Sequence, residues 1–118
     1  MGESVLRDKS YTFAIEIVKL SQKLQKESKE YVLSKQILRS GTAIGALIAE
    51  AEFGQSKADF IHKLTIALTE ANETKYWLNL LKDTGFLNQT KFETLYSSCL
   101  ELIRILVASI KTTKSRLK

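Results

Sequence analysis

The sequence predicts an all-α protein, an antiparallel up-down-up-down bundle of four helices in a single domain over residues 1–118. Two observations lead to this prediction. The chain contains no proline and only five glycines, so few residues interrupt a helix. Apolar residues also recur three and four positions apart along most of the chain, which is the period of one helix face. Short connections between the segments make consecutive helices antiparallel.

The first predicted helix covers about residues 9–26, and a polar run follows it. Its apolar residues lie on one stripe: Phe13, Ile17, Leu20 and Leu24. The second helix covers about residues 30–53, with Ser28 as the expected N-cap. It ends at Gly54, because glycine adopts the backbone conformation that terminates helices.

The third predicted helix covers residues 57–84, begins after the N-cap Ser56 and ends at Gly85. The fourth covers residues 89–114, with Asn88 as its N-cap. Its apolar residues have the near-heptad spacing of a bundle helix: Phe92, Leu95, Cys99, Leu102, Leu106 and Ile110.

Composition indicates a cytoplasmic protein without a membrane segment. Cys99 is the single cysteine, so the chain has no disulfide framework. The N-terminal residues contain no apolar signal core. The longest uncharged run, residues 40–49, is too short to span a bilayer.

The charge distribution favours an anionic partner. The net charge is +5, and residues 111–118 carry four cations and no acid. RNA is the obvious partner for such a surface, although a merely solvated basic tail is an alternative that the sequence leaves open. The candidate nucleic-acid contacts are Lys35, Arg39, Lys63, Lys111, Lys114, Arg116 and Lys118.

Two glycines and an apolar excess indicate tight packing and self-association. Gly41 and Gly45 lie four residues apart within a predicted helix, where each costs up to about 1 kcal/mol relative to alanine. Close approach of another helix is the usual compensation. The second and fourth helices also carry apolar residues on more than one face, which a further subunit would cover.

Aromatic and acidic residues of the third helix complete the expected packing surface. The side chains of Tyr76 and Trp77 are better suited to an interface between subunits than to stacking on nucleic-acid bases. Glu70 and Glu73 are expected to pair with Arg39 or with a lysine such as Lys75. The candidate packing and interface residues are Gly41, Gly45, Leu47, Glu70, Glu73, Tyr76 and Trp77.

The sequence does not indicate an enzyme. His62 is the single histidine, whereas a di-iron bundle requires a Glu-x-x-His motif from each of two helices. Cys99 is flanked by apolar residues, as an inert buried thiol would be. We therefore expect no catalytic residues, no metal and no cofactor.

Several ordered motifs resemble the bacterial four-helix bundle family encoded by intervening sequences of 23S ribosomal RNA genes, over about residues 11–110. The motifs are Gln36-x-x-Arg39, Gly41-x-x-Ile-Gly-Ala-x-x-x-Glu-Ala51, Gln55-Ser-Lys-Ala-Asp-Phe60 and Glu70-Ala-x-Glu-Thr-x-Tyr-Trp-Leu78. Two positions depart from the family pattern, because Ala43 and Leu47 stand where it usually has serine and asparagine. The departure favours a packed interface over a polar binding site on the second helix.

The resemblance implies a ring, typically a homopentamer, with no established catalytic activity. The related accessory variability determinant proteins of diversity-generating retroelements resemble the same pentameric barrel, and they engage a reverse transcriptase and nucleic acid through a basic surface. The first functional hypothesis is therefore an oligomeric scaffold that binds RNA or a ribonucleoprotein. The second is a protein–protein adaptor without affinity for nucleic acid.

Overall fold

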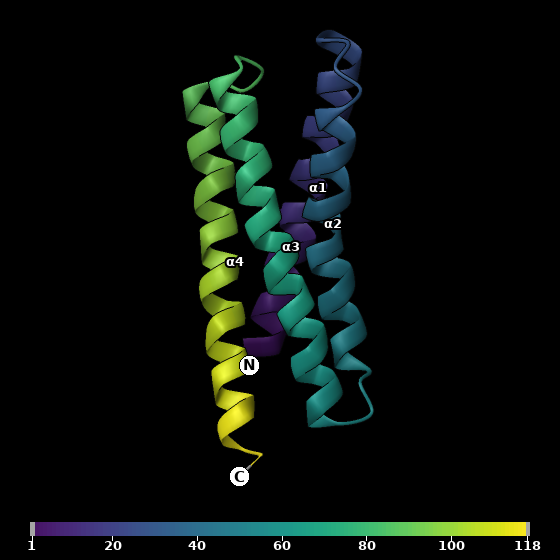
Figure 1. Cartoon of the computed structure of the whole chain (residues 1–118), viewed down its shortest axis with the longest axis vertical. Coiled ribbons are helices and arrows are strands. Elements are labelled where there is room, and N and C mark those ends of the chain that lie inside the picture. The colour runs from purple at the N-terminus through teal and green to yellow at the C-terminus, as the bar shows by residue number, and fades with distance from the viewer. Residues whose placement is uncertain (1, 118) are drawn as a thin grey trace.

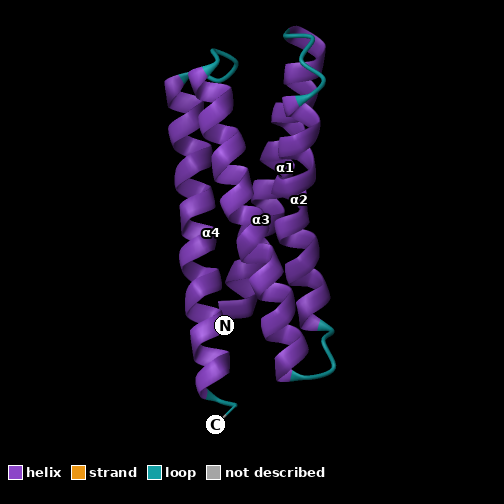
Figure 2. Ribbon diagram, in the orientation of Figure 1, coloured by secondary structure: helices purple, strands orange, loops and turns teal. Residues whose placement is uncertain are grey.

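The computed structural model describes residues 2–117, with side chains from Val5 onward, and these residues form four helices and no strand (Figure 2). The helices are α1 (Gly2–Glu27), α2 (Leu33–Glu52), α3 (Lys57–Asp83) and α4 (Gln89–Ser115). They alternate in direction and form two helical hairpins, α1–α2 and α3–α4 (Figure 1). The bundle is a rod with extents of 50 × 21 × 19 Å. The predicted fold class is confirmed. No helix in the described part of the chain is both long and apolar enough to cross a bilayer.

The first helix begins at Gly2, earlier than the predicted start at residue 9. The reason is that the core stripe continues toward the N-terminus. Leu6 lies seven residues before Phe13, and both side chains are buried. Since residues seven apart share a helix face, Leu6 extends the contact of α1 with the core.

The turn between α1 and α2 differs from the prediction. Lys29 has a positive φ of 55°, which ends the helical path, and α2 begins only at Leu33. The carboxylate of Glu30 accepts hydrogen bonds from the backbone N–H groups of Leu33 (3.0 Å) and Ser34 (2.7 Å). A carboxylate here satisfies free N–H groups and interacts favourably with the helix dipole. Glu30, rather than Ser28, therefore caps the second helix.

The caps of the other two helices are confirmed. The Ser56 hydroxyl accepts a hydrogen bond from the Asp59 N–H (3.1 Å), and the Asn88 side chain accepts one from the Lys91 N–H (2.8 Å). Gly85 adopts a φ of +84° after α3, where a Cβ would be strained. The helix ends at residues 52, 83 and 115 lie one residue from their predicted positions.

One apolar stripe from each helix forms the core, and α1 and α2 approach closely within it. A Cβ added at Gly41 would lie 2.8 Å from Ile17 Cγ2, closer than side chains pack. At Gly45, an added Cβ would lie 3.4 Å from the Ser10 carbonyl oxygen, which is an ordinary contact. The bare backbone at Gly41 therefore permits the approach of α1.

The predicted apolar excess is largely used inside the chain itself. Ile44 and Ile48 are fully buried and Leu47 is half-buried, because α2 packs against both α1 and α3. On α4, Ile105 is half-buried and Val107 is 38% exposed. The prediction of an exposed apolar face on the second helix was therefore wrong.

Buried hydroxyl groups connect the first three helices. The Ser21 hydroxyl of α1 donates to the Ser34 carbonyl of α2 (3.0 Å), and the hydroxyls of Ser40 and Thr74 share a hydrogen bond between α2 and α3 (2.9 Å). Throughout the part of the chain whose side chains are described, every buried side-chain nitrogen and oxygen has a partner. These hydrogen bonds define how the helices align along their axes.

Candidate nucleic-acid interface

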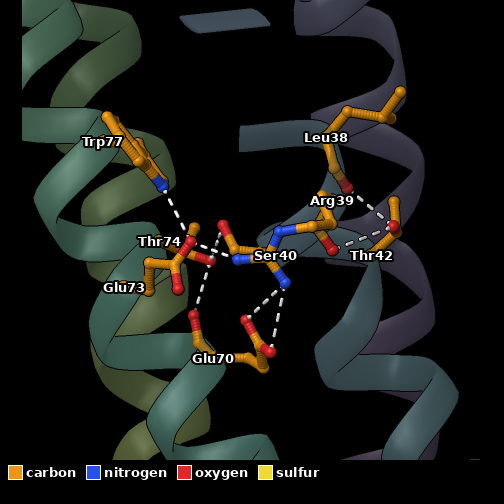
Figure 3. Close-up of polar contacts among 8 residues, drawn as sticks. All are labelled: Leu38, Arg39, Ser40, Thr42, Glu70, Glu73, Thr74 and Trp77. Carbon is orange, nitrogen blue, oxygen red and sulfur yellow. Dashed lines mark hydrogen bonds and ion pairs between the residues drawn. The ribbon is translucent and has the colours of Figure 1, made fainter. Parts of the chain in front are cut away.

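Arg39 forms the centre of a charged network between α2 and α3 (Figure 3). One guanidinium nitrogen lies 3.2 Å from each carboxylate oxygen of Glu70, and the other pairs with Glu73. The indole N–H of Trp77 donates to the same Glu73 carboxylate (3.1 Å). Four residues of the expected contact and packing sets therefore form one intramolecular cluster.

The pKa values in this network reflect the pairing. The hydrogen bonds that Arg39 donates to Glu70 and Glu73 raise the pKa of Arg39 above its ordinary value. The hydrogen bond from Trp77, assisted by Arg39 and opposed by partial desolvation, lowers the pKa of Glu73. Both shifts favour the charged forms of Arg39 and Glu73. Because one cation faces two carboxylates, this cluster is unsuited to bind phosphate.

Two further predicted contacts lie apart from each other. Lys63 near the start of α3 pairs with Glu50 of α2 (Nζ–Oε1 2.8 Å), which neutralises its charge locally. Lys35 is exposed in the first turn of α2, at the opposite end of the rod. The structure therefore does not bring Lys35, Arg39 and Lys63 together as one surface.

The remaining contacts gather at the end of α4. Lys111, Lys114 and Arg116 are exposed over the last turns of this helix, and Lys118 lies outside the described residues. The sequence contains no acid after Glu101, so no carboxylate of α4 itself offsets these cations. This basic end of α4 is the strongest nucleic-acid candidate among the predicted residues.

The expected packing residues of α3 point in two directions. Trp77 is half-buried within the network, whereas Tyr76 is 60% exposed and packs edge-to-face against the indole ring (5.0 Å between ring centroids). Tyr76 is thus available for a contact outside the chain.

An exposed apolar stripe on α1 was missed by the sequence analysis. Tyr11, Ile15 and Val18 are 69%, 42% and 36% exposed. Their spacing of four and three residues was a readable signal, because it defines a second helix face beside the core stripe. This α1 stripe, rather than α2, presents the larger apolar face to solvent.

A basic pocket was also missed. It has a volume of about 270 Å³ and lies between the second half of α1 and the turn that connects α3 to α4. Three lysines line it, namely Lys19, Lys23 and Lys91. Its apolar lining comes from Leu20, Leu24, Phe86 and Leu87. Sequence reasoning had no signal for it, since its two walls lie 58 or more residues apart in the sequence.

A second hollow of about 300 Å³ lies farther along the α1–α4 seam and has the opposite charge. Asp8, Glu16 and Glu101 line it together with Lys9, which pairs with Glu101 at 3.3 Å. This hollow repels phosphate. Among the described residues, no group of three or more histidine, cysteine, aspartate or glutamate side chains is placed to hold a metal ion.

The geometry defines a helical bundle with basic surfaces at both ends of α4 and no assembled catalytic group among the described residues. Residues 3–108 match the family model described as 23S rRNA-intervening sequence protein. The chain belongs to this family, as its motifs predicted.

A solved structure agrees with the fold throughout. It is the crystal structure of a protein with unknown function from the S23 ribosomal protein family of Bacteroides thetaiotaomicron. The two chains are 52% identical, the match covers 94% of this chain and 99% of that chain, and the TM-score is 0.93. No curated protein matches the chain. Neither the family nor the Bacteroides protein is described as having an enzymatic activity.

Proposed function

We propose that the protein is a non-enzymatic, homo-oligomeric scaffold that binds RNA, or a ribonucleoprotein, in the cytoplasm. The observation that carries this proposal is the basic end of α4. Residues 102–118 contain five cations and no acid, and the three described cations at the end of the helix are exposed. Lysine and arginine on a helix end attract phosphate through charge rather than sequence.

Self-association strengthens the proposed interaction. The exposed α1 stripe and Tyr76 supply apolar surface for subunit contacts. The family resemblance favours a ring of five subunits, whose formal charge would be 5 × (+5) = +25. Such a field raises the local concentration of polyanions and speeds their association. Recognition would use RNA shape and phosphate, because no predicted contact reads base edges.

A protein adaptor is the second candidate function. The observation in its favour is the same exposed apolar stripe, which a partner other than a second copy would also cover. A reverse transcriptase bound to nucleic acid, the partner of the related retroelement accessory proteins, would combine both functions. Recovery of one protein at fixed ratio after nuclease treatment would favour the adaptor.

Binding of fluorescently labelled RNA at several salt concentrations tests the RNA proposal. Affinity should fall between about 50 and 200 mM salt, as it does whenever phosphate contacts release counterions. The triple variant K111Q/K114Q/R116Q should reduce the slope of log K against log salt by about 2 units. The matched control K9Q/K26Q/K57Q removes the same amount of charge from residues outside the basic end of α4. It should retain most of the slope of log K against log salt.

Native mass spectrometry of protein purified at low salt tests the assembly. A mass five times that of the chain, with additional mass removed by ribonuclease, would support both the ring and the RNA. Affinity that does not change with salt would contradict the RNA proposal. A monomer would contradict the ring.

A further inference from the structure

The basic pocket between α1 and the α3–α4 turn has the chemistry of a nucleotide site. We infer that it binds one unpaired nucleotide of single-stranded RNA, with the base against Phe86 and the phosphate among Lys19, Lys23 and Lys91. This inference rests on the proposed RNA-binding function and locates a second contact for it.

The charge of the pocket suits one phosphate group. Its lining contains three lysines and one carboxylate, Glu16, for a local charge of 3 − 1 = +2. Glu16 lies between two of the lysines, 3.3 Å from Lys91 Nζ and 3.8 Å from Lys19 Nζ. One carboxylate shared by two cations leaves positive charge uncompensated, and Lys23 has no ion pair among the described residues. A phosphate would balance this excess.

The turn after α3 places the aromatic residue Phe86 on the pocket wall. Gly85 has a φ of +84°, and the Phe86 N–H donates to the Leu81 carbonyl (2.9 Å), as in a Schellman motif. Leu87 is buried beside it, whereas Phe86 is 38% exposed on the pocket wall. The backbone of Phe86 is thus anchored between Leu81 and the buried Leu87, and its ring is partly exposed to solvent. Such a ring can stack a base of any identity.

The size of the pocket favours a single nucleotide. Its volume of about 270 Å³ is near the lower end of small-molecule sites, which run from roughly 300 to 1,000 Å³. The apolar wall and the lysines also match the two parts of a nucleotide, a flat base and an anionic phosphate. The acidic hollow along the same seam lacks this combination.

The pocket lies at the opposite end of α4 from the basic tail. Lys91 of the pocket and Lys111 of the basic end lie 20 residues apart on this helix, which separates them by about 30 Å. The two contacts can therefore be removed independently. A single RNA strand engaged at both would run along the length of the rod.

Two variants and two probes test the inference. The probes are a labelled oligouridylate of about ten nucleotides and an abasic strand of the same length. Phe86→Ala should weaken oligouridylate binding roughly tenfold, leave the abasic strand unaffected and leave the salt slope unchanged. Lys23→Gln should weaken the binding of both probes and reduce the slope of log K against log salt by about 0.7.

Phe53→Ala is the matched control, because Phe53 is 84% exposed and lies outside the pocket. It should bind both probes as the unmodified protein does. Uridine monophosphate carries only one of the phosphates of a strand, so it should displace the oligouridylate only at millimolar concentration. Displacement at micromolar concentration would assign the pocket to free nucleotides and overturn the RNA inference.

The other outcomes separate this inference from the proposed function. If Phe86→Ala and Lys23→Gln bind both probes normally while K111Q/K114Q/R116Q does not, the pocket inference is wrong and the RNA proposal stands. If the unmodified protein binds neither probe at low salt, the RNA proposal fails and the pocket inference fails with it.

Discussion

Replacing Gly41 by alanine should destabilise the protein, although alanine is the better helix former. The new Cβ would lie 2.8 Å from Ile17 Cγ2 and 2.9 Å from Ile17 Cγ1. Ile17 is fully buried, and β-branched side chains have little freedom at χ1. The isoleucine therefore cannot turn away from the added methyl group, and α1 has to move from α2.

The expected magnitude follows from two opposing effects. Alanine in a helix interior gains about 1 kcal/mol over glycine. Overpacking in a close-packed core costs about 1–3 kcal/mol, and two contacts below 3.0 Å place this site toward the upper end. The net loss in unfolding free energy should be about 1–2 kcal/mol, or roughly 3–8 °C in Tm.

Urea unfolding at fixed protein concentration measures this change, and Gly45→Ala is its control. The Cβ at Gly45 would lie 3.4 Å from the Ser10 carbonyl oxygen, so this variant should gain up to about 1 kcal/mol. In an Ile17→Ala background, which lacks the clashing atoms, Gly41→Ala should become stabilising. If Gly41→Ala stabilises the unmodified chain as much as Gly45→Ala does, the steric argument is refuted.

Three further predictions concern a thiol, a carboxylate and a cap. Burial raises the pKa of Cys99 to about 12, so the native protein should not react with a thiol reagent at pH 8 but should react in urea. For Glu30, desolvation is the largest single effect and raises the pKa, but the backbone hydrogen bonds from Leu33, Ser34 and Val32 together outweigh it, so the pKa falls below its ordinary 4.5. The folded state therefore gains stability from this carboxylate above pH 4.5 and loses it as the pH falls through the lowered pKa. Glu30→Gln should show a smaller loss of unfolding free energy over that acid range; an unchanged profile would contradict the assignment. Ser56→Ala removes the acceptor of the Asp59 N–H and should cost about 1 kcal/mol in urea unfolding, whereas Ser56→Asp should retain the cap.

Local features of the fold were predictable, because their causes lie within a few residues. Ser56 and Asn88 cap helices through neighbours three positions away, and Gly85 ends α3 through its own backbone. The cap of α2 was misplaced because a glutamate side chain is long enough to reach several N–H groups ahead of it. Ser28 matches the usual preference for serine at helix N-caps, yet Glu30 lies closer to the start of α2 and its carboxylate reaches the free N–H groups.

The candidate site was less predictable, since it depends on which helices face each other. The sequence indicated that Arg39 could bind phosphate. In the structure, Glu70 and Glu73 of α3, which lie 31 and 34 residues away in sequence, pair with its guanidinium. The basic pocket likewise combines α1 with the α3–α4 turn. Composition indicates that cations are in excess, but tertiary packing decides which of them are free.

The uneven distribution of buried hydroxyls has a mechanical consequence. Sliding α1, α2 or α3 by one turn would break the Ser21–Ser34 or Ser40–Thr74 hydrogen bond and leave polar atoms in an apolar core, at about 1–3 kcal/mol each. Besides its buried apolar stripe, α4 contacts the other helices through the weak hydrogen bond of the Cys99 thiol to the Ala71 carbonyl and through surface ion pairs. An axial shift of α4 by one turn would therefore break fewer buried hydrogen bonds than the same shift of α1, α2 or α3.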